Sequence, residues 1–195
     1  MIDREANHAR HKRPARIIAK VNALLDRPII EALYRASRAG VEIDLIVRGA
    51  CALRPNVKDV SHRIRVRSIV GRFLEHSRIF YFENGGEPDM YLGSADWMPR
   101  NLYERVEVMF PIKSPALRER VFGEILQNYL KDSEKTRILR QNGSYSRAYQ
   151  ASNSKNGTNG RRFSAQDFFM DLAEGRGTAK PSSRKYRTIA PVLVA

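Results

Sequence analysis

Strand and helix patterns alternate along most of this chain and predict an α/β fold, with a mixed sheet flanked by helices in a single lobe. Residues 16–22 and 41–47 have the apolar pattern of strands, and residues 26–40 between them repeat at helical spacing. A strand-helix-strand unit of this length favours a parallel pair with a right-handed crossover. Residues 79–82 and 90–92 form two further apolar runs around Asn84-Gly85, the signal of a hairpin turn.

These patterns divide residues 1–148 into two segments. Residues 1–14 are basic and form either the end of a helix or a loose arm, and residues 15–148 form the lobe. In the strand 16–22, we expect buried Ile17 and Ile18, with Lys20 and Asn22 together on the opposite face. We expect Asp26 to cap the following helix, Pro28 to lie in its first turn and Gly40 to end it.

Residues 63–68 alternate strictly between basic and apolar side chains after a loop at 51–61. Arg63, Arg65 and Arg67 share one face of this predicted strand. They form either a solvated basic face or a positive track along a polyanion channel, and no acidic residue lies between them in the sequence. The pattern therefore favours the track, with Arg65 and Arg67 as phosphate ligands.

The second half contains fewer patterned segments. We expect a last strand over residues 105–112, an amphipathic helix over 115–130 and a polar turn over 141–147. Residues 149–195 are predicted to be a flexible basic tail, which contains a Ser-, Asn- and Gly-rich linker at 151–160 and a short helix at 163–172 capped by Ser164. The basic segment from 175 to the end is predicted to be disordered.

Composition restricts the class of protein and its partners. The chain has 195 residues and a formal net charge of +14, from 35 Lys+Arg and 21 Asp+Glu, which predicts a polyanionic partner. Its single cysteine, Cys51, excludes an internal disulfide and fits a reducing compartment. No apolar run approaches the roughly 20 residues of a membrane span, and no signal peptide is recognisable at the start. We expect a cytoplasmic protein without a membrane span.

Polar residues gather beside the two apolar runs of the hairpin. His76 and Arg78 precede the first run and point to one face of an extended chain, and the second run leads into Ser94 and Asp96. Histidine exchanges a proton near neutral pH, as general acid-base catalysis requires, which makes His76 a candidate catalytic residue, although a lone histidine beside an apolar run is usually structural. Arg48 follows a strand end, where α/β sheets bind ligands, although an ordinary surface arginine would look the same.

The hairpin resembles half of a phospholipase D superfamily active site, whose pattern is His-x-Lys followed by Gly-Ser-x-Asn. This chain has Arg78 in place of the lysine and Asp96 in place of the asparagine, which argues against a phosphodiesterase. Three longer segments, LIVRGACALRP, IRVRSIVGRFLEHSRIFYF and SADWMPRNLYERVEV, resemble the C-terminal catalytic lobe of bacterial polyphosphate kinase. The resemblance runs from about Asp3 to about Ser146, with a weaker similarity near 163–174, and implies a phospholipase D-like fold.

The resemblance implies an activity and a site. Polyphosphate kinase transfers the terminal phosphate of ATP to polyphosphate, reversibly. By resemblance, Arg48 binds nucleotide phosphates and His76 is the second histidine of the family, an acid or a phosphate-binding partner. The residues expected to bind nucleotide or phosphate are Arg48, Arg65, Arg67, His76, Arg78, Ser94, Asp96, Arg100, Asn101 and Arg105.

The same resemblance implies that the chain contains half of an active site. In the family, the phosphohistidine and the Mg²⁺ ligands belong to a preceding lobe, so no metal ligand is expected in this chain. The expected substrates are ATP or ADP and polyphosphate. The expected partners are the missing lobe or a second copy, with a homo-oligomer for a full-length enzyme, and the isolated chain is expected to have little activity.

Two other functions remain open from the sequence. One is a homodimeric phospholipase D-like phosphodiesterase or nuclease, in which two copies of His76 face each other across a two-fold axis. The other is a non-catalytic polyanion-binding remnant of a kinase. For that module, binding would be sensitive to salt and unchanged by His76→Ala.

Overall fold

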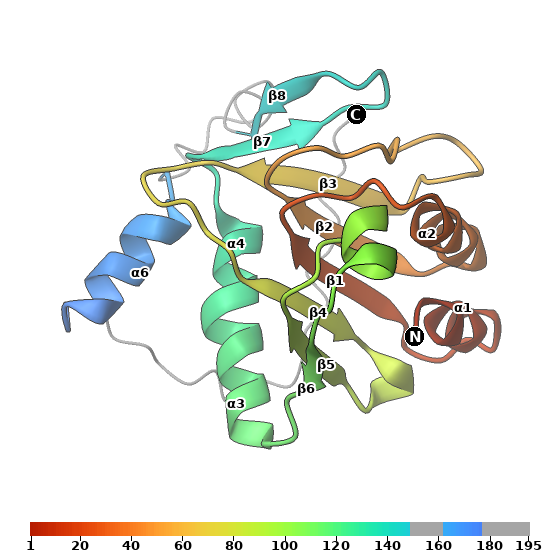
Figure 1. Ribbon diagram of the computed structural model, residues 1–195, viewed down its shortest axis with the longest axis horizontal. Helices are drawn as coiled ribbons and strands as arrows, with labels where there is room; N and C mark the ends of the chain where they lie inside the picture. The colour runs from red at the N-terminus through yellow and green to blue at the C-terminus, as the bar shows by residue number, and fades with distance from the viewer. Residues whose placement is uncertain (149–161, 177–195) are drawn as a thin grey trace.

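A computed structural model describes residues 1–148 and 162–176 of the protein as one sheet with helices on both faces (Figure 1). The strands are β1 (Arg16–Val21), β2 (Glu42–Val47), β3 (Ile64–Ile69), β4 (Arg78–Phe82), β5 (Asp89–Gly93), β6 (Met109–Pro111), β7 (Thr136–Leu139) and β8 (Tyr145–Arg147). The helices are α1 (Ile2–Arg10), α2 (Arg27–Ala39), α3 (Pro115–Arg120), α4 (Gln127–Lys131) and α6 (Ala165–Ala173), with short helical turns η1 (Asn84–Gly86), η2 (Arg100–Glu104) and η3 (Val121–Leu126).

The sheet is mixed, as the sequence predicts. Its eight strands have the order β6-β5-β4-β1-β2-β3-β7-β8. The central strands β1, β2 and β3 are parallel, and each remaining strand is antiparallel to its neighbour. The strand-helix-strand unit and the antiparallel hairpin around Asn84-Gly85 are thus both confirmed.

The caps of α2 follow the predicted chemistry. The Asp26 side chain accepts a hydrogen bond from the backbone N–H of Ile29 at 3.0 Å, and Pro28 lies in the first turn. Gly40 ends the helix with φ +107°, a left-handed conformation that costs glycine little. These caps fix where β1 ends and β2 begins, and therefore where the loops after both strands lie.

Each face of the sheet has its own apolar core. Side chains such as Ile17, Leu45 and Val66 pack against α1 and α2 on one face. Ile18, Ile46 and Tyr81 pack on the other face, under α6 and the long helix that α3, η3 and α4 form in succession. Alternate residues of the central strands are thus buried on both sides, as expected for parallel strands covered by helices.

The region after the hairpin differs from the prediction. A last strand over 105–112 is wrong: only Met109–Pro111 pair with β5, and Val106, Val108 and Phe110 are exposed. Two strands follow it, and the predicted polar turn at 141–147 contains β8. β7 and β8 are short strands at one side of the sheet, and such strands bury little, so the sequence shows no clear apolar alternation there.

The remaining segments agree with their patterns or lie outside the description. Residues 2–10 form α1, and the helix predicted at 115–130 is present as α3, η3 and α4 in succession. Ser164 caps α6 by accepting a hydrogen bond from the Asp167 N–H. The predicted linker at 151–160, and the predicted disordered end beyond residue 176, lie outside the described residues.

Candidate active site

The site lies at the edge of the sheet where the parallel strands end. Asn22 follows β1 and Arg48 follows β2, and β4 runs antiparallel to β1 and therefore begins at this edge with Arg78. Arg78 pairs in register with Gly93 at the end of β5, so Ser94 and Asp96 also arrive here. The topology thus brings together residues that are up to 74 positions apart in sequence.

Arg78 and Asp96 form a bidentate ion pair at the centre of this edge. The distances are 3.2 Å from Nε to Oδ1 and 3.0 Å from Nη2 to Oδ2, and both side chains are largely buried. The backbone N–H of Asn22 also donates to Oδ1, at 2.6 Å. Burial alone would raise the pKa of Asp96, but the hydrogen bonds from Arg78 and Asn22 outweigh it and lower the pKa.

Arg48 is anchored at one nitrogen and has no counterion among the described residues. Its Nη1 donates to the carbonyl oxygen of Glu75 at 2.6 Å, and Ser68 Oγ donates to the main-chain oxygen of Arg48 at 2.8 Å. Within the described ranges, no carboxylate forms an ion pair with Arg48. A fixed guanidinium without a counterion is suited to binding a phosphate group.

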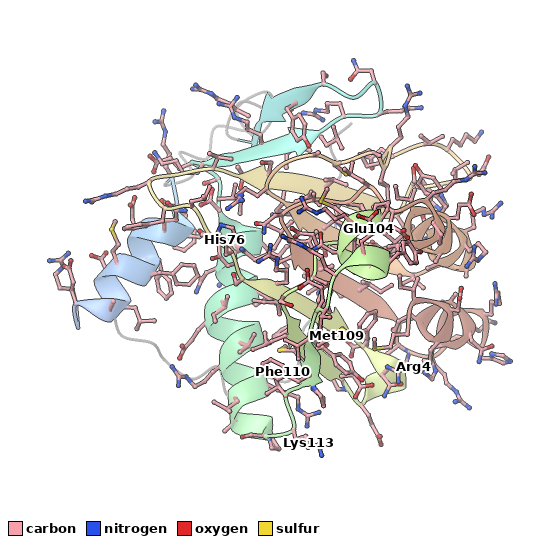
Figure 2. All side chains as sticks on the ribbon, in the orientation of Figure 1. Arg4, His76, Glu104, Met109, Phe110 and Lys113 are labelled. Atoms are coloured by element: carbon pink, nitrogen blue, oxygen red, sulfur yellow. The ribbon has the colours of Figure 1, made fainter. Side chains whose placement is uncertain are left out.

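His76 is exposed on the loop between β3 and β4 (Figure 2). Its main-chain oxygen accepts a hydrogen bond from Arg78 Nη1 at 2.6 Å, which ties the histidine backbone to the ion pair. Its imidazole has no hydrogen-bond partner among the residues that the structure describes. The ring is therefore free to meet a ligand at the sheet edge.

Two buried polar residues that were not among the predicted site residues, Lys20 and Gln166, support this loop. Lys20 on β1 forms an ion pair with Glu75 at 3.1 Å and donates to Ser77 Oγ at 3.0 Å. Gln166 on α6 donates to Glu75 Oε1 at 2.8 Å and to the Phe73 carbonyl oxygen at 2.9 Å. Burial lowers the pKa of Lys20, although Glu75 opposes this shift. The predicted common face of Lys20 and Asn22 was the signal in the sequence.

Ser94 and Asn101 converge on a third residue, Glu107. Both donate hydrogen bonds to its carboxylate, from the hydroxyl and from the amide respectively. These two bonds are the main cause of the lowered pKa of Glu107. The Ser94 hydroxyl also accepts from the Val108 N–H at 3.0 Å, so it holds the chain that leads into β6. In this structure, Ser94 and Asn101 position that segment.

Arg100 and Arg105 lie at the two ends of η2 and are exposed. Neither forms an ion pair within the described part of the chain. Arg105 therefore has no salt bridge with Glu104 or Glu107 among the described residues. Trp97 is buried and stacks on Phe80 with ring centroids 5.4 Å apart.

The arginines of the basic track predicted on β3 are paired with other groups of the chain in this structure. Arg65 bonds Asp44 at 2.7 Å and Glu42 at 2.8 Å, and Arg63 pairs with Glu42. Arg67 donates to the Leu130 carbonyl and is largely buried. The carboxylates come from β2, which pairs in parallel with β3, so the sequence of β3 alone does not show them. Arg65 and Arg67 therefore are structural ion-pair residues and not a free phosphate track.

The described residues do not form a ready-made metal cage. Within residues 1–148 and 162–176, no three His, Cys, Asp or Glu side chains gather where they could hold an ion together. Asp96, the acidic residue at the centre of the site, is occupied by Arg78. The described residues therefore do not fit a metal ion that they would hold by themselves.

The fold and the site define a mixed α/β lobe in which charged and polar side chains gather at the carboxyl ends of the parallel strands. Residues 1–159 match the family model described as polyphosphate kinase C-terminal domain 2, and the chain belongs to this family. This match confirms the predicted resemblance to the C-terminal lobe of polyphosphate kinase, and the mixed sheet flanked by helices confirms the α/β fold.

Several similar proteins have the name polyphosphate kinase. The polyphosphate kinases of Xylella fastidiosa strain 9a5c and Pseudomonas aeruginosa strain PAO1 are 56% and 57% identical over 144 and 147 residues, which are 74% and 75% of this chain. The crystal structure of polyphosphate kinase from Porphyromonas gingivalis has a TM-score of 0.80 at 36% identity, and the match covers 90% of this chain and 26% of that one.

The chain spans about a fifth of the length of these curated relatives, 21% in both cases. None of the helices in the described residues is apolar over a stretch long enough for a bilayer.

Proposed function

We propose that this chain is the nucleotide- and phosphate-binding half of a polyphosphate kinase site, which transfers the terminal phosphate of ATP reversibly to polyphosphate. The observation that carries the proposal is the arrangement of Arg48 and His76 at one sheet edge. Among the described residues, Arg48 has no counterion and the ring of His76 has no hydrogen-bond partner. Membership of the polyphosphate kinase family supports the choice of reaction.

Each residue has a distinct task in this proposal. Arg48 grips phosphate oxygens through the guanidinium nitrogens that are not committed to Glu75, and so offsets charge that develops during transfer. His76, exposed beside it, holds a phosphate oxygen or delivers a proton to the leaving oxygen. Arg78 is a positioning residue, because its guanidinium fixes both the His76 backbone and Asp96.

The Asp96 carboxylate would repel phosphate if it stood alone. Its bidentate contact with Arg78 neutralises that charge, so the pair can lie at a phosphate site without opposing binding. This arrangement gives the departure from the asparagine of the phospholipase D pattern a physical reason: the acid and the arginine compensate each other.

Another lobe would supply the rest of the site, which is the phosphohistidine and the Mg²⁺ ligands. The chain covers about a fifth of its relatives, and its described residues do not form a metal cage, so magnesium would enter with the nucleotide phosphates and with residues supplied by that lobe. Full-length relatives would then provide the second half of the site, and this chain would have little activity alone.

The testing experiment measures ATP formation from ADP and long-chain polyphosphate in the presence of magnesium. We would assay the purified chain alone, the preceding portion of a relative such as the Pseudomonas aeruginosa enzyme alone, and the mixture. Activity in the mixture only would support the proposal. Activity of the chain alone would contradict the half-site, and no activity in any arm would contradict the kinase assignment if the mixed parts form a complex.

Two further arms separate the other functions. Hydrolysis of a phosphodiester by the isolated chain would favour the homodimeric hydrolase. Salt-sensitive polyphosphate binding that His76→Ala leaves unchanged, together with silence in the kinase assay, would favour the binding module.

A further inference from the structure

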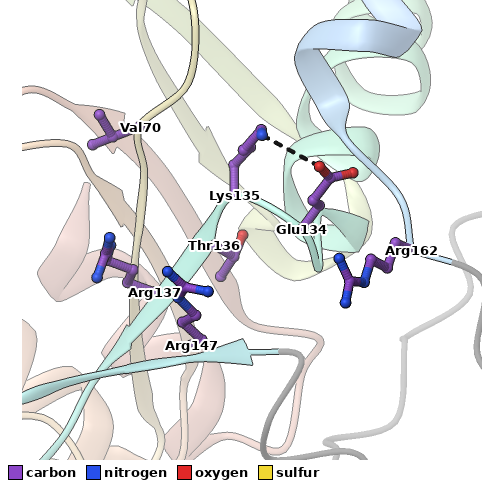
Figure 3. Close-up of a pocket in the computed structure, with 7 residues that line it drawn as sticks. All are labelled: Val70, Glu134, Lys135, Thr136, Arg137, Arg147 and Arg162. Carbon is purple, nitrogen blue, oxygen red and sulfur yellow. Dashed lines mark ion pairs between the residues drawn. The ribbon is translucent and has the colours of Figure 1, made fainter.

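A basic hollow lies beside the candidate active site, where β7 and β8 meet the segment that leads into α6 (Figure 3). Its volume is about 230 Å³. The residues that line it are Val70, Glu134, Lys135, Thr136, Arg137, Arg147 and Arg162. Four of these seven side chains are cationic and one is acidic, so the hollow has a net positive charge.

Arg137 and Arg147 give this hollow its character. They are directly opposite each other in the antiparallel pairing of β7 and β8, and both are exposed. Neither forms an ion pair in the part of the chain that the structure describes. Like charges directly opposite on neighbouring strands are destabilising, so this arrangement costs stability unless an anion lies between them.

The rest of the hollow does not neutralise the two arginines. The acidic residue, Glu134, is 3.2 Å from the ammonium of its sequence neighbour Lys135, and that contact is drawn in Figure 3. The contrast with β3 is direct, because Arg63 and Arg65 there are paired with carboxylates of β2. The β7–β8 arginines are therefore available to an anion from outside.

The hollow and the candidate active site share one edge of the sheet. Thr136, the first residue of β7, pairs with Ile69 at the end of β3, and Arg137 pairs with Ser68. Ser68 in turn donates a hydrogen bond to the main-chain oxygen of Arg48. Three strand spacings separate β2 from β8, which corresponds to about 14 Å. A single extended polyanion can span that distance.

We propose that the hollow formed by Arg137, Arg147 and Lys135 is a subsite for polyphosphate, which holds a part of the chain remote from the reacting end. The inference rests on the proposed function and deepens it. Guanidinium groups grip phosphate oxygens in pairs, and Val70 is the one apolar side chain that lines the hollow, which offers little to a nucleotide base. The subsite therefore selects long phosphate chains over nucleotides and short phosphates.

The test compares two double variants that lose the same charge. Arg137→Gln/Arg147→Gln removes the subsite. Arg10→Gln/Arg13→Gln is the matched control, because both residues are exposed near α1, before β1, at the opposite edge of the sheet. Binding of fluorescently labelled long-chain polyphosphate is measured by anisotropy over a series of salt concentrations, with tripolyphosphate, ADP and single-stranded DNA as competitors.

We expect the subsite variant to bind long-chain polyphosphate at least about tenfold more weakly. We also expect the slope of log affinity against log salt concentration to become less steep by roughly 0.7 for each phosphate group that the variant no longer binds. We expect no change in competition by ADP or tripolyphosphate, and a control variant close to wild type. Because the change relieves a like-charge pair, the Tm of the subsite variant should equal or exceed that of the wild type.

Equal weakening in both double variants would overturn the subsite, because net charge alone would then explain the binding. An unchanged affinity in the subsite variant, or equal competition by DNA and polyphosphate, would overturn it as well. If the double variant unfolds, Arg147→Gln alone provides the same comparison against Arg10→Gln. The assay requires no catalysis, so selective loss of binding without kinase activity in any mixture would contradict the proposed reaction and leave the subsite intact.

Discussion

Arg78 donates two parallel hydrogen bonds to Asp96, from Nε to Oδ1 at 3.2 Å and from Nη2 to Oδ2 at 3.0 Å. They join the start of β4 to the segment after β5. The pair also connects to β1 through the Asn22 N–H, and to the His76 backbone through Arg78 Nη1. One ion pair thus holds three strands and the loop of the candidate catalytic histidine in place.

Asp96→Asn should lower the free energy of unfolding by about 2 kcal/mol, because a charge-assisted bidentate contact becomes a neutral one and leaves the largely buried Arg78 without a counterion. Urea unfolding at neutral pH measures this. The matched control is Asp171→Asn, whose ion pair with Arg176 is exposed and should contribute under about 0.5 kcal/mol. Equal effects of the two variants would contradict a special role for the pair.

The stability of the protein should fall on acidification in a way that depends on Asp96. Its pKa in the folded state is lowered, so this carboxylate stabilises the fold above the unfolded-state value of about 4, and that contribution is lost as the pH falls through the lowered pKa. Urea midpoints between about pH 6 and pH 3 should decline less steeply in Asp96→Asn than in the wild type. Parallel curves would show that Asp96 does not titrate with folding.

His76→Ala should reduce ATP formation in the two-part assay by about a hundredfold or more, since the proposed proton donor or phosphate ligand is lost. His62→Ala is the control: His62 is also exposed but lies before β3, at the opposite edge of the sheet, and should leave the rate unchanged. Polyphosphate affinity should change little in either variant. A normal rate in His76→Ala would remove His76 from the mechanism.

Gly40→Ala should destabilise the protein by roughly 1–2 kcal/mol, because alanine is strained at φ +107°. The space around the glycine is not the cause, since an added Cβ would meet Ala9 at an ordinary 3.8 Å. The control is Gly123→Ala on the long helix, where a Cβ meets nothing within 4 Å and should stabilise by about 0.5–1 kcal/mol. Thermal unfolding of both variants measures the difference, and a shift of the same sign in both would contradict the strain at Gly40.

The sequence by itself determined the elements whose signals are local. The Asp26 cap, the Gly40 end of α2 and the Asn84-Gly85 turn each depend on residues a few positions apart, and so do the apolar runs of β1, β2 and β4. The convergence of His76 and Arg78 with Ser94 and Asp96 also followed from the order of strands around one hairpin.

Tertiary structure alone decided which charges are free. Arg65 looked available on β3 and is bound by Glu42 and Asp44 from the neighbouring strand, whereas Arg137 and Arg147 lay in a segment without a pattern and face each other without a carboxylate in the described structure. The pairing of a charge depends on residues that the chain brings together across strands. Those partners are distant in sequence, so periodicity and spacing do not reveal them.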